Sequence, residues 1–176
     1  MNISLVRVDN RLIHGQILEA WVPYVQATCI IVADDDVASD FFRETVIRMA
    51  VPREIDVVIN SVEEFVSSFS YSERSGKKTI LLFSSVTEAI KAYNLGFRYK
   101  KLNIGNVYSE EGTIRCARSI NFGDHEINDI LSLIKAGVLV ELRCVPKDKP
   151  IEFREAMKRA GHAICDPGEK GNNIGP

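Results

Sequence analysis

The feature that most constrains the fold is an alternation of continuous apolar runs with segments of helical periodicity. Seven segments predict β-strands, at residues 3–8, 28–33, 55–59, 79–83, 102–105, 114–119 and 138–145, and the clearest of them are continuous apolar runs. Between them lie segments predicted to be helical, at residues 15–25, 37–50, 63–69, 86–93, 125–135 and 151–159; in the first, apolar side chains recur with the spacing of an amphipathic helix. Strands without a polar face are typical of parallel sheets that helices cover on both sides. The sequence therefore predicts an α/β fold, a single domain with a mostly parallel open β-sheet of about seven strands and helices on both faces.

Composition agrees with one globular domain. Of the 176 residues, 45% are hydrophobic and 26% are charged, which is ordinary for a domain with a sizeable core. We expect the domain to span residues 1–160. Residues 161–176 are turn-rich and poor in apolar side chains, so we expect a loosely ordered tail there.

Charge and cysteine usage exclude several classes of protein. The formal net charge is −2, without the basic excess of a general nucleic-acid or membrane-surface binder. The sequence has no apolar run near the ~20 residues of a membrane span and no signal-peptide pattern at its start. The four cysteines form no C-x-x-C pair, so zinc and redox-disulfide sites are disfavoured and reduced thiols are expected. These features predict a cytoplasmic protein.

The carboxyl ends of the predicted strands indicate where a site should lie, because ligands of open parallel sheets bind beyond those ends. Four polar loops meet this rule: residues 9–14, 34–36, 84–85 and 105–106. The first is the most distinctive. It begins the octet Asp-Asn-Arg-Leu-Ile-His-Gly-Gln at residues 9–16, which joins the first strand to the first helix. We therefore expect the four loops to share one rim, with this octet as its chemical centre.

His14 is the candidate nucleophile of this rim. A neutral imidazole is a competent nucleophile at cellular pH. Gly15 permits close backbone approach, and the helix that starts there offers unpaired N–H groups to an anion. Arg11, three residues earlier, carries a planar fork suited to phosphate oxygens. The residues alone leave two interpretations of His14 open: a histidine that carries a phosphoryl group in an anion site, or a histidine that caps or packs at the helix start.

Other polar residues of the rim have two interpretations each. Asp9 and Asn10 are common turn formers, and Asp9 is also placed to hold Arg11 or His14 by a hydrogen bond. Ser84, with the serine that follows it, suits a helix cap and secondarily a hydroxyl donor to phosphate. The three aspartates at residues 34–36 suit a helix N-cap with an acidic first turn better than a metal pocket.

A metal or nucleotide site is not predicted. A receiver-type acidic pocket would need a further aspartate after the third strand and a lysine after the fifth. The chain has Asn60-Ser61 and Gly105-Asn106 at those places. Gly105 also lacks the glycine pattern of a dinucleotide or Walker loop.

The octet at residues 9–16 resembles the signature of the IIB subunits of the mannose/fructose/sorbose family of the bacterial phosphoenolpyruvate-dependent sugar phosphotransferase system (PTS). The resemblance covers about residues 1–160, continuing through residues 30–38, 81–83, 102–106 and 141–146. Two positions depart from the usual pattern: Asn10 replaces an aspartate and Asn106 replaces a glycine. Neither change removes the histidine or the arginine.

The resemblance implies a phosphotransferase component. His14 would accept a phosphoryl group on Nδ1 from a phosphohistidine of a IIA protein and transfer it to a sugar held by the membrane IIC/IID subunits. Arg11 would neutralise the phosphate, and no cofactor or metal would be needed. The supporting residues expected around the phosphate are Asp9, Asn10, Gly15, Gln16 and Ser84. The protein would then be cytoplasmic and peripherally associated with the permease.

Alternatives remain open at this stage. A regulatory PTS phosphoprotein that signals through the phosphorylation state of His14 would need the same loop, and a small-ligand module with an anion site would need no covalent step. Leu12 and Ile13 are either a docking surface or buried under the turn. A homodimer is compatible with the sequence, and the sugar is not specified by it.

Overall fold

We describe a computed structural model of the chain, over residues 2–71, 76–109 and 114–162. Residues 163–176, which include Cys165 and most of the predicted tail, lie outside the described residues. Among the described cysteines, Cys29 is buried, Cys116 and Cys144 are half-buried, and all three are free thiols. None of the helices in the described ranges has the length and apolar character needed to cross a bilayer.

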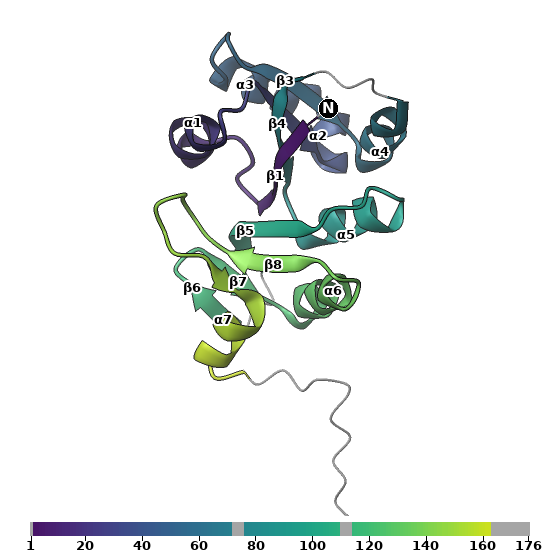
Figure 1. Cartoon of the computed structure of the whole chain (residues 1–176). Helices are drawn as coiled ribbons and strands as arrows, with labels where there is room; N and C mark the ends of the chain where they lie inside the picture. Colours follow the sequence, from purple (N-terminus) through teal and green to yellow (C-terminus); the bar gives the residue numbers. More distant parts are fainter. Residues whose placement is uncertain (1, 72–75, 110–113, 163–176) are drawn as a thin grey trace, which may run out of the picture.

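The described residues form a nine-stranded sheet, which confirms the predicted α/β class (Figure 1). The strands are β1 (Asn2–Asp9), β2 (Cys29–Ala33), β3 (Asp56–Asn60), β4 (Lys78–Phe83), β5 (Lys101–Tyr108), β6 (Ile114–Ala117), β7 (Ile120–Phe122), β8 (Leu139–Leu142) and β9 (Ile151–Glu152). Their order is β3-β2-β4-β1-β5-β7-β6, with β8 paired to β5 and β9 to β8. The pairs β6–β7 and β8–β9 are antiparallel and the other pairs are parallel.

Two short strands, β7 and β9, go beyond the seven predicted runs. The run predicted at residues 114–119 ends at Ala117 and turns back into β7. The start of the helix predicted at residues 151–159 pairs instead with β8 as β9. Strands of two or three residues are too short to show a period in sequence, which explains why pattern alone did not predict them.

Apolar side chains of the central strands point alternately to two hydrophobic clusters, one on each face of the sheet. In β2, Cys29, Ile31 and Ala33 pack in one cluster, while Ile30 and Val32 pack in the other. Both faces are therefore buried, which is why these strands read as unbroken apolar runs.

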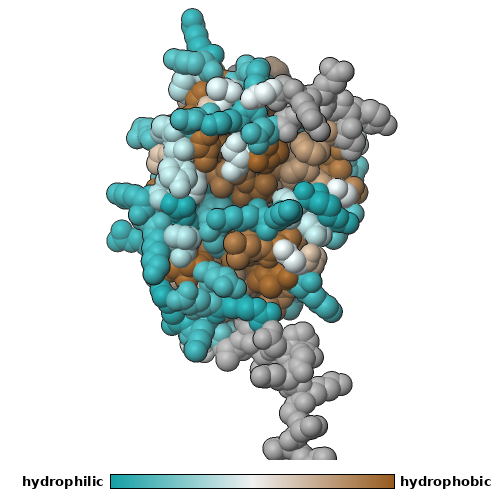
Figure 2. Space-filling model, viewed as in Figure 1, coloured by the Kyte–Doolittle hydropathy of each residue, from teal (hydrophilic) through white to brown (hydrophobic). Residues whose placement is uncertain are grey.

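Helices cover the two faces in separate groups. The first cluster includes side chains of α4 (Val62–Tyr71), α5 (Val86–Asn94), α6 (Asp124–Lys135) and α7 (Phe153–Arg159). The second includes side chains of the π-helical segment η1 (Gln16–Trp21) and of α1 (Val22–Val25) and α2 (Asp35–Ser39), with α3 (Phe41–Ala50) packed against it. Figure 2 shows hydrophilic residues crossing the middle of one face between two hydrophobic areas.

The predicted helix at residues 37–50 is two helices separated at Asp40. The backbone of Asp40 is extended, and its carboxylate accepts hydrogen bonds from the N–H groups of Phe42 at 3.0 Å and Arg43 at 3.1 Å. This contact is an N-cap, so α3 starts anew instead of continuing α2. The break sets the direction of α3 beside the candidate site.

Candidate functional site

The loop after β1 is a tightly held turn. Leu12 has a positive φ of 51° and is buried, a conformation that is rare for a bulky residue. Its N–H donates to the carbonyl of Asp9 at 2.8 Å, and the N–H of Asn10 donates to the carbonyl of Asn106 at 3.0 Å. Leu12 is thus under the turn, while Ile13 is half-buried. Backbone strain of this kind persists only where surrounding contacts impose it.

His14 is fixed by the carboxylate of Asp9. Its Nε2 lies 3.0 Å from Oδ2 of Asp9, and the other carboxylate oxygen accepts the backbone N–H of Arg11 at 3.2 Å. The side chain of Asp9 is fully buried and that of His14 keeps 9% of its exposure. Nδ1 of His14 makes no hydrogen bond with the part of the chain that the structure describes. Asp9 therefore engages Nε2 of His14, while Nδ1 has no partner among the described residues.

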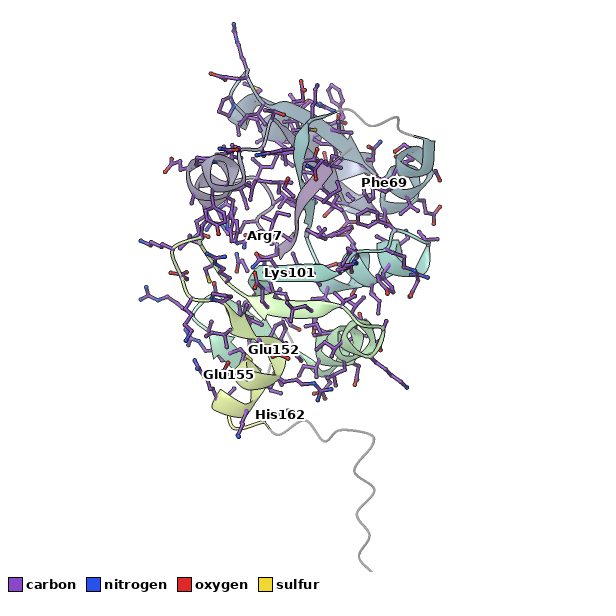
Figure 3. The ribbon with its side chains drawn as sticks, in the orientation of Figure 1. Arg7, Phe69, Lys101, Glu152, Glu155 and His162 are labelled. Atoms are coloured by element: carbon purple, nitrogen blue, oxygen red, sulfur yellow. The ribbon has the colours of Figure 1, made fainter. Side chains whose placement is uncertain are left out.

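Arg7 completes this arrangement and was not predicted from sequence. Its guanidinium is fully buried and lies 2.8 Å from Oδ2 of Asp9 through Nη2, with Nε at 3.3 Å from the same oxygen. It also donates to the side-chain oxygen of Asn103 and to the carbonyls of Arg143 at 2.9 Å and Cys144 at 3.1 Å. In Figure 3 Arg7 lies in the interior, between α1 and β5. The signal that could have revealed Arg7 is a charged residue inside an otherwise apolar strand.

Asp9 is ionised in this setting. Burial alone would raise the pKa of its carboxyl, but the hydrogen bond from His14 and the charge of Arg7 outweigh burial and lower the pKa. Burial lowers the pKa of Arg7, while the charge of Asp9 opposes that shift. Arginine nevertheless stays protonated in proteins. The pair is thus a buried cation and anion, with His14 hydrogen-bonded to the anion.

Gly105 in β5 makes room for Arg7. A Cβ atom built on Gly105 would overlap the guanidinium of Arg7. Glycine weakens the interior of a strand, and at this position the packing of Arg7 explains its presence. The guanidinium lies against bare backbone, which is why the neighbouring strand needs a glycine there.

Trp21 covers the same cation. Its ring centroid lies 5.2 Å from the guanidinium carbon of Arg7, and its indole N–H donates to the carbonyl of Cys144 at 3.0 Å. The guanidinium of Arg143 lies 5.4 Å from the same ring and 5.4 Å from that of Tyr24. The segment after the octet, through Trp21, and the loop after β8, through the carbonyls of Arg143 and Cys144, therefore both contact the guanidinium of Arg7.

The remaining predicted residues of the octet lie at the surface. Arg11, Asn10, Gly15 and Gln16 are exposed. The guanidinium of Arg11 makes no hydrogen bond or ion pair with the described residues, and it lines a pocket of about 310 Å³. A Cβ on Gly15 would meet only Oε1 of Glu19 at 3.9 Å, so packing within the described chain does not require a glycine there.

The loops after β2 and β4 form a second polar cluster on the same edge of the sheet. Asp34 caps α2 by accepting the N–H of Val37 at 2.7 Å. Asp35 accepts the N–H of Val62 at 2.9 Å and pairs with Lys91 at 2.6 Å. The aspartates thus serve as caps and links between helices. No group of residues suited to a metal ion occurs within the described ranges.

Ser84 is engaged in this second cluster. Its hydroxyl and its N–H donate to Glu88 at 2.8 and 3.2 Å, and the other oxygen of Glu88 accepts the N–H of Asp35 at 3.0 Å. Ser85 caps α5, since its hydroxyl accepts the N–H of Glu88 at 3.2 Å. Burial, together with the charge of Asp34, raises the pKa of Glu88 to about 7, although the hydrogen bonds from Ser84 and Asp35 oppose this shift. The structure therefore places Ser84 against Glu88, in a different cluster from His14.

The chain matches a known protein family and several of its members over most of its length. Residues 3–166 match the family described as "PTS system sorbose subfamily IIB component". The chain is 31% identical over 158 residues to the PTS system fructose-specific EIIB component of Bacillus subtilis, covering 90% of this chain and 97% of that protein. It is 28% identical over 166 residues to the sorbose-specific EIIB component of Klebsiella pneumoniae, covering 94% and 100%.

The fold agrees with solved structures of such components. The crystal structure of the IIBSor domain of the sorbose permease from Klebsiella pneumoniae superposes with a TM-score of 0.83 at 28% identity, covering 94% of this chain and all of that one. The family match at residues 3–166 includes the octet. The chain belongs to the sorbose subfamily of PTS IIB components.

Proposed function

We propose that this protein is a phosphohistidine carrier in sugar uptake. His14 accepts a phosphoryl group from a phosphohistidine of a IIA protein and transfers it to a sugar bound by the membrane IIC/IID subunits. The observation that carries the proposal is the contact of Asp9 with Nε2 of His14, which leaves Nδ1 as the free nitrogen. The protein would work in the cytoplasm, at the surface of the permease.

The electrostatics of Asp9 select the reactive form of the histidine. An ionised carboxylate can only accept a hydrogen bond, so Nε2 of His14 must carry the proton. In the neutral ring Nδ1 then holds the lone pair that attacks phosphorus. This is the same atom that the family resemblance implies.

The transfer balances without a cofactor. As the Nδ1–P bond forms, the P–N bond of the donor breaks and the donor ring keeps the electron pair. The phosphorylated ring of His14 retains the Nε2 proton, and the carboxylate of Asp9 stabilises its positive charge. In the second step the sugar oxygen attacks phosphorus and the Nδ1 electron pair returns to the ring. Because Nε2 is already protonated, the hydroxyl proton leaves to a base on the acceptor side.

Arg11 is the cation available to the phosphoryl group. Arg7 is buried and paired with Asp9, whereas Arg11 is exposed and unpaired among the described residues. Phosphoryl transfer depends chiefly on positioning and on charge neutralisation. Gly15 has no packing requirement within the described chain, which is consistent with close approach of phosphate oxygens to its backbone. Asn10 and Gln16 would support the same phosphate from the exposed side of the turn.

Phosphorylation mapped by mass spectrometry tests the proposal. A phosphoenolpyruvate-driven cascade with a matching IIA protein should place one acid-labile phosphate on His14. His14→Ala should abolish it, while the matched variant His125→Ala, at an exposed histidine of α6, should not. Stoichiometric phosphate at another residue would refute the proposal. Transfer onward to sugar in membranes that contain IIC/IID separates a carrier from a regulatory phosphoprotein, which would stop at His14.

A second variant tests Arg11. Arg11→Ala should preserve the fold and slow phosphorylation of His14 by about 10³–10⁵-fold, as for other arginines that stabilise phosphoryl transfer. Arg53→Ala changes an exposed arginine of the loop before β3 and should leave the rate unchanged. An unaltered rate in Arg11→Ala would show that backbone amides carry the charge.

A further inference from the structure

The helix α3 presents apolar side chains to solvent. Phe41 is 83% exposed, Phe42 75%, Val46 50% and Met49 82%, and no residue of α3 is fully buried. Three of them, Phe42, Val46 and Met49, follow the helical spacing and form one stripe. Single exposed apolar residues are common, but a contiguous stripe of large side chains marks an interaction surface.

This stripe is continuous with the catalytic loop. A pocket of about 310 Å³ has one wall from the octet and one from α3. Its lining residues are Asn10, Arg11, Leu12, Ile13, Phe42, Arg43, Val46 and Ile47. A partner that fills this pocket therefore touches the loop that holds His14. We call the exposed stripe and this pocket together the α3 face.

The charge of the α3 face is positive. Arg11 and Arg43 are the charged residues among those described as lining the pocket. The carboxylates nearest to them have other contacts: Asp40, at the N-cap of α3, accepts two backbone N–H groups, and Glu44 pairs with Arg48 at 2.8 Å. An apolar surface with two unneutralised cations suits a partner with an apolar contact area beside a negative group.

We propose that the α3 face is the docking surface for the protein that donates the phosphoryl group. This inference rests on the proposed function, because it assumes that His14 is phosphorylated by another protein. The donor carries a doubly charged phosphohistidine, which complements Arg11 and Arg43. The acceptor differs, since it presents a neutral sugar, and cytoplasmic loops of membrane proteins carry an excess of lysine and arginine. Arg43, which takes no part in the proposed transfer, would repel such loops.

Steady-state transfer kinetics test the assignment. The double variant Phe42→Ser/Met49→Ser removes two apolar contacts, and Arg43→Glu reverses one charge. Each should lower kcat/KM for transfer from the phosphorylated IIA protein by about 10–100-fold, the loss typical of interface anchors. The loss should be mainly in KM. Leu95→Ser, at an exposed leucine just after α5, is the matched control and should have no effect.

A small phosphoryl donor separates docking from chemistry. Phosphoramidate phosphorylates histidine without a protein interface, so its reaction with His14 should be unchanged in the α3 variants. If neither donor phosphorylates His14 in the wild-type protein, the proposed function itself fails. If only the transfer to sugar in IIC/IID membranes is slowed, the occupant is the permease and the docking assignment is wrong. Loss of a concentration-dependent dimer in the variants, with normal transfer from IIA, would likewise assign the face to a second copy of this chain and overturn it.

Discussion

Two carboxylates at the same edge of the sheet have opposite electrostatic settings. Asp9, after β1, meets the guanidinium of Arg7 and the ring of His14, and its pKa is lowered. Glu88, at the start of α5, accepts hydrogen bonds from Ser84 and from backbone N–H groups but faces Asp34, and its pKa is raised to about 7. Both link neighbouring loops. Only one of them is kept charged by a buried cation.

Under the proposed function, this difference in pKa separates a carboxylate that supports the chemistry of His14 from one that joins neighbouring loops. Asp9 must stay ionised if it is to fix the proton of His14 on Nε2 and stabilise the phosphorylated ring. Glu88 joins the loops after β2 and β4, and a neutral carboxyl can still accept the N–H of Asp35 and donate to Ser84. The predictions below test this comparison.

The largest effect is expected for the cation beneath Asp9. Arg7→Met leaves a buried carboxylate without its partner and should lower the free energy of unfolding by about 3–5 kcal/mol. Lys91→Met removes the partner of Asp35, but that pair is about 35–44% exposed, so its loss should be less than about 1 kcal/mol. Urea unfolding monitored by circular dichroism measures both. Equal losses of unfolding free energy in the two variants would mean that the buried Arg7–Asp9 pair is no more important for stability than the exposed Lys91–Asp35 pair.

A smaller effect is expected from one methyl group. Gly105→Ala keeps all polar groups but displaces the guanidinium of Arg7. We expect a loss of about 1–3 kcal/mol, as for other overpacked sites, together with slower phosphorylation of His14. Gly76→Ala is the matched control, because a Cβ there meets no atom within 4 Å. Normal phosphorylation in Gly105→Ala would show that the position of Arg7 is not important for the histidine.

The pH dependence of stability should have opposite signs at the two carboxylates. The pKa of Glu88 rises from 4.5 to about 7 on folding, so the folded chain binds more protons between these values and stability falls as the pH rises through them. We expect a fall on the order of 1–2 kcal/mol, reduced by the solvent that reaches this carboxyl. The lowered pKa of Asp9 gives stability that is present above about pH 3.8 and lost below it.

Glu88→Gln isolates the first of these contributions. The variant mimics the neutral carboxyl, so it should lack the fall between pH 4.5 and 7 and be the more stable protein at pH 7. Urea unfolding at a series of pH values gives the difference between the two chains. If the free energies of unfolding of the wild-type protein and Glu88→Gln change in parallel with pH, Glu88 does not change protonation on folding.

The sequence predicts local elements of this structure better than its long-range contacts. Unbroken apolar runs predicted the central strands, because both faces of those strands are buried. The octet was predicted to lie at the end of the first strand, where the structure has it. Arg7 was missed because its partners Asn103 and Arg143 are distant in sequence, and only the register of β1, β5 and β8 brings them together.

The α3 segment shows a second limit. The sequence predicts one helix over residues 37–50, whereas the structure has a separate helix α3 whose large apolar side chains face solvent. Periodicity fixes which residues share a face but not what that face contacts. The N-cap at Asp40, by contrast, depends on residues next to it in sequence, since its carboxylate accepts the N–H of Arg43 three residues later. An aspartate at the start of a helical segment is a pattern that the sequence alone could have revealed.

The smallest effect is expected for Ser84, which was predicted to support the phosphate. Its hydroxyl donates to Glu88 and lies in the cluster after β4, so Ser84→Ala should cost about 1 kcal/mol of stability, the typical worth of one hydrogen bond. Phosphorylation of His14 should stay within about twofold of the wild-type rate, in contrast to the large loss expected for Arg11→Ala on the same edge. Rapid-quench measurement of phosphorylated protein compares the two variants directly. A rate that falls with Ser84→Ala at unchanged stability would restore the serine to the phosphate site and join the two clusters into one.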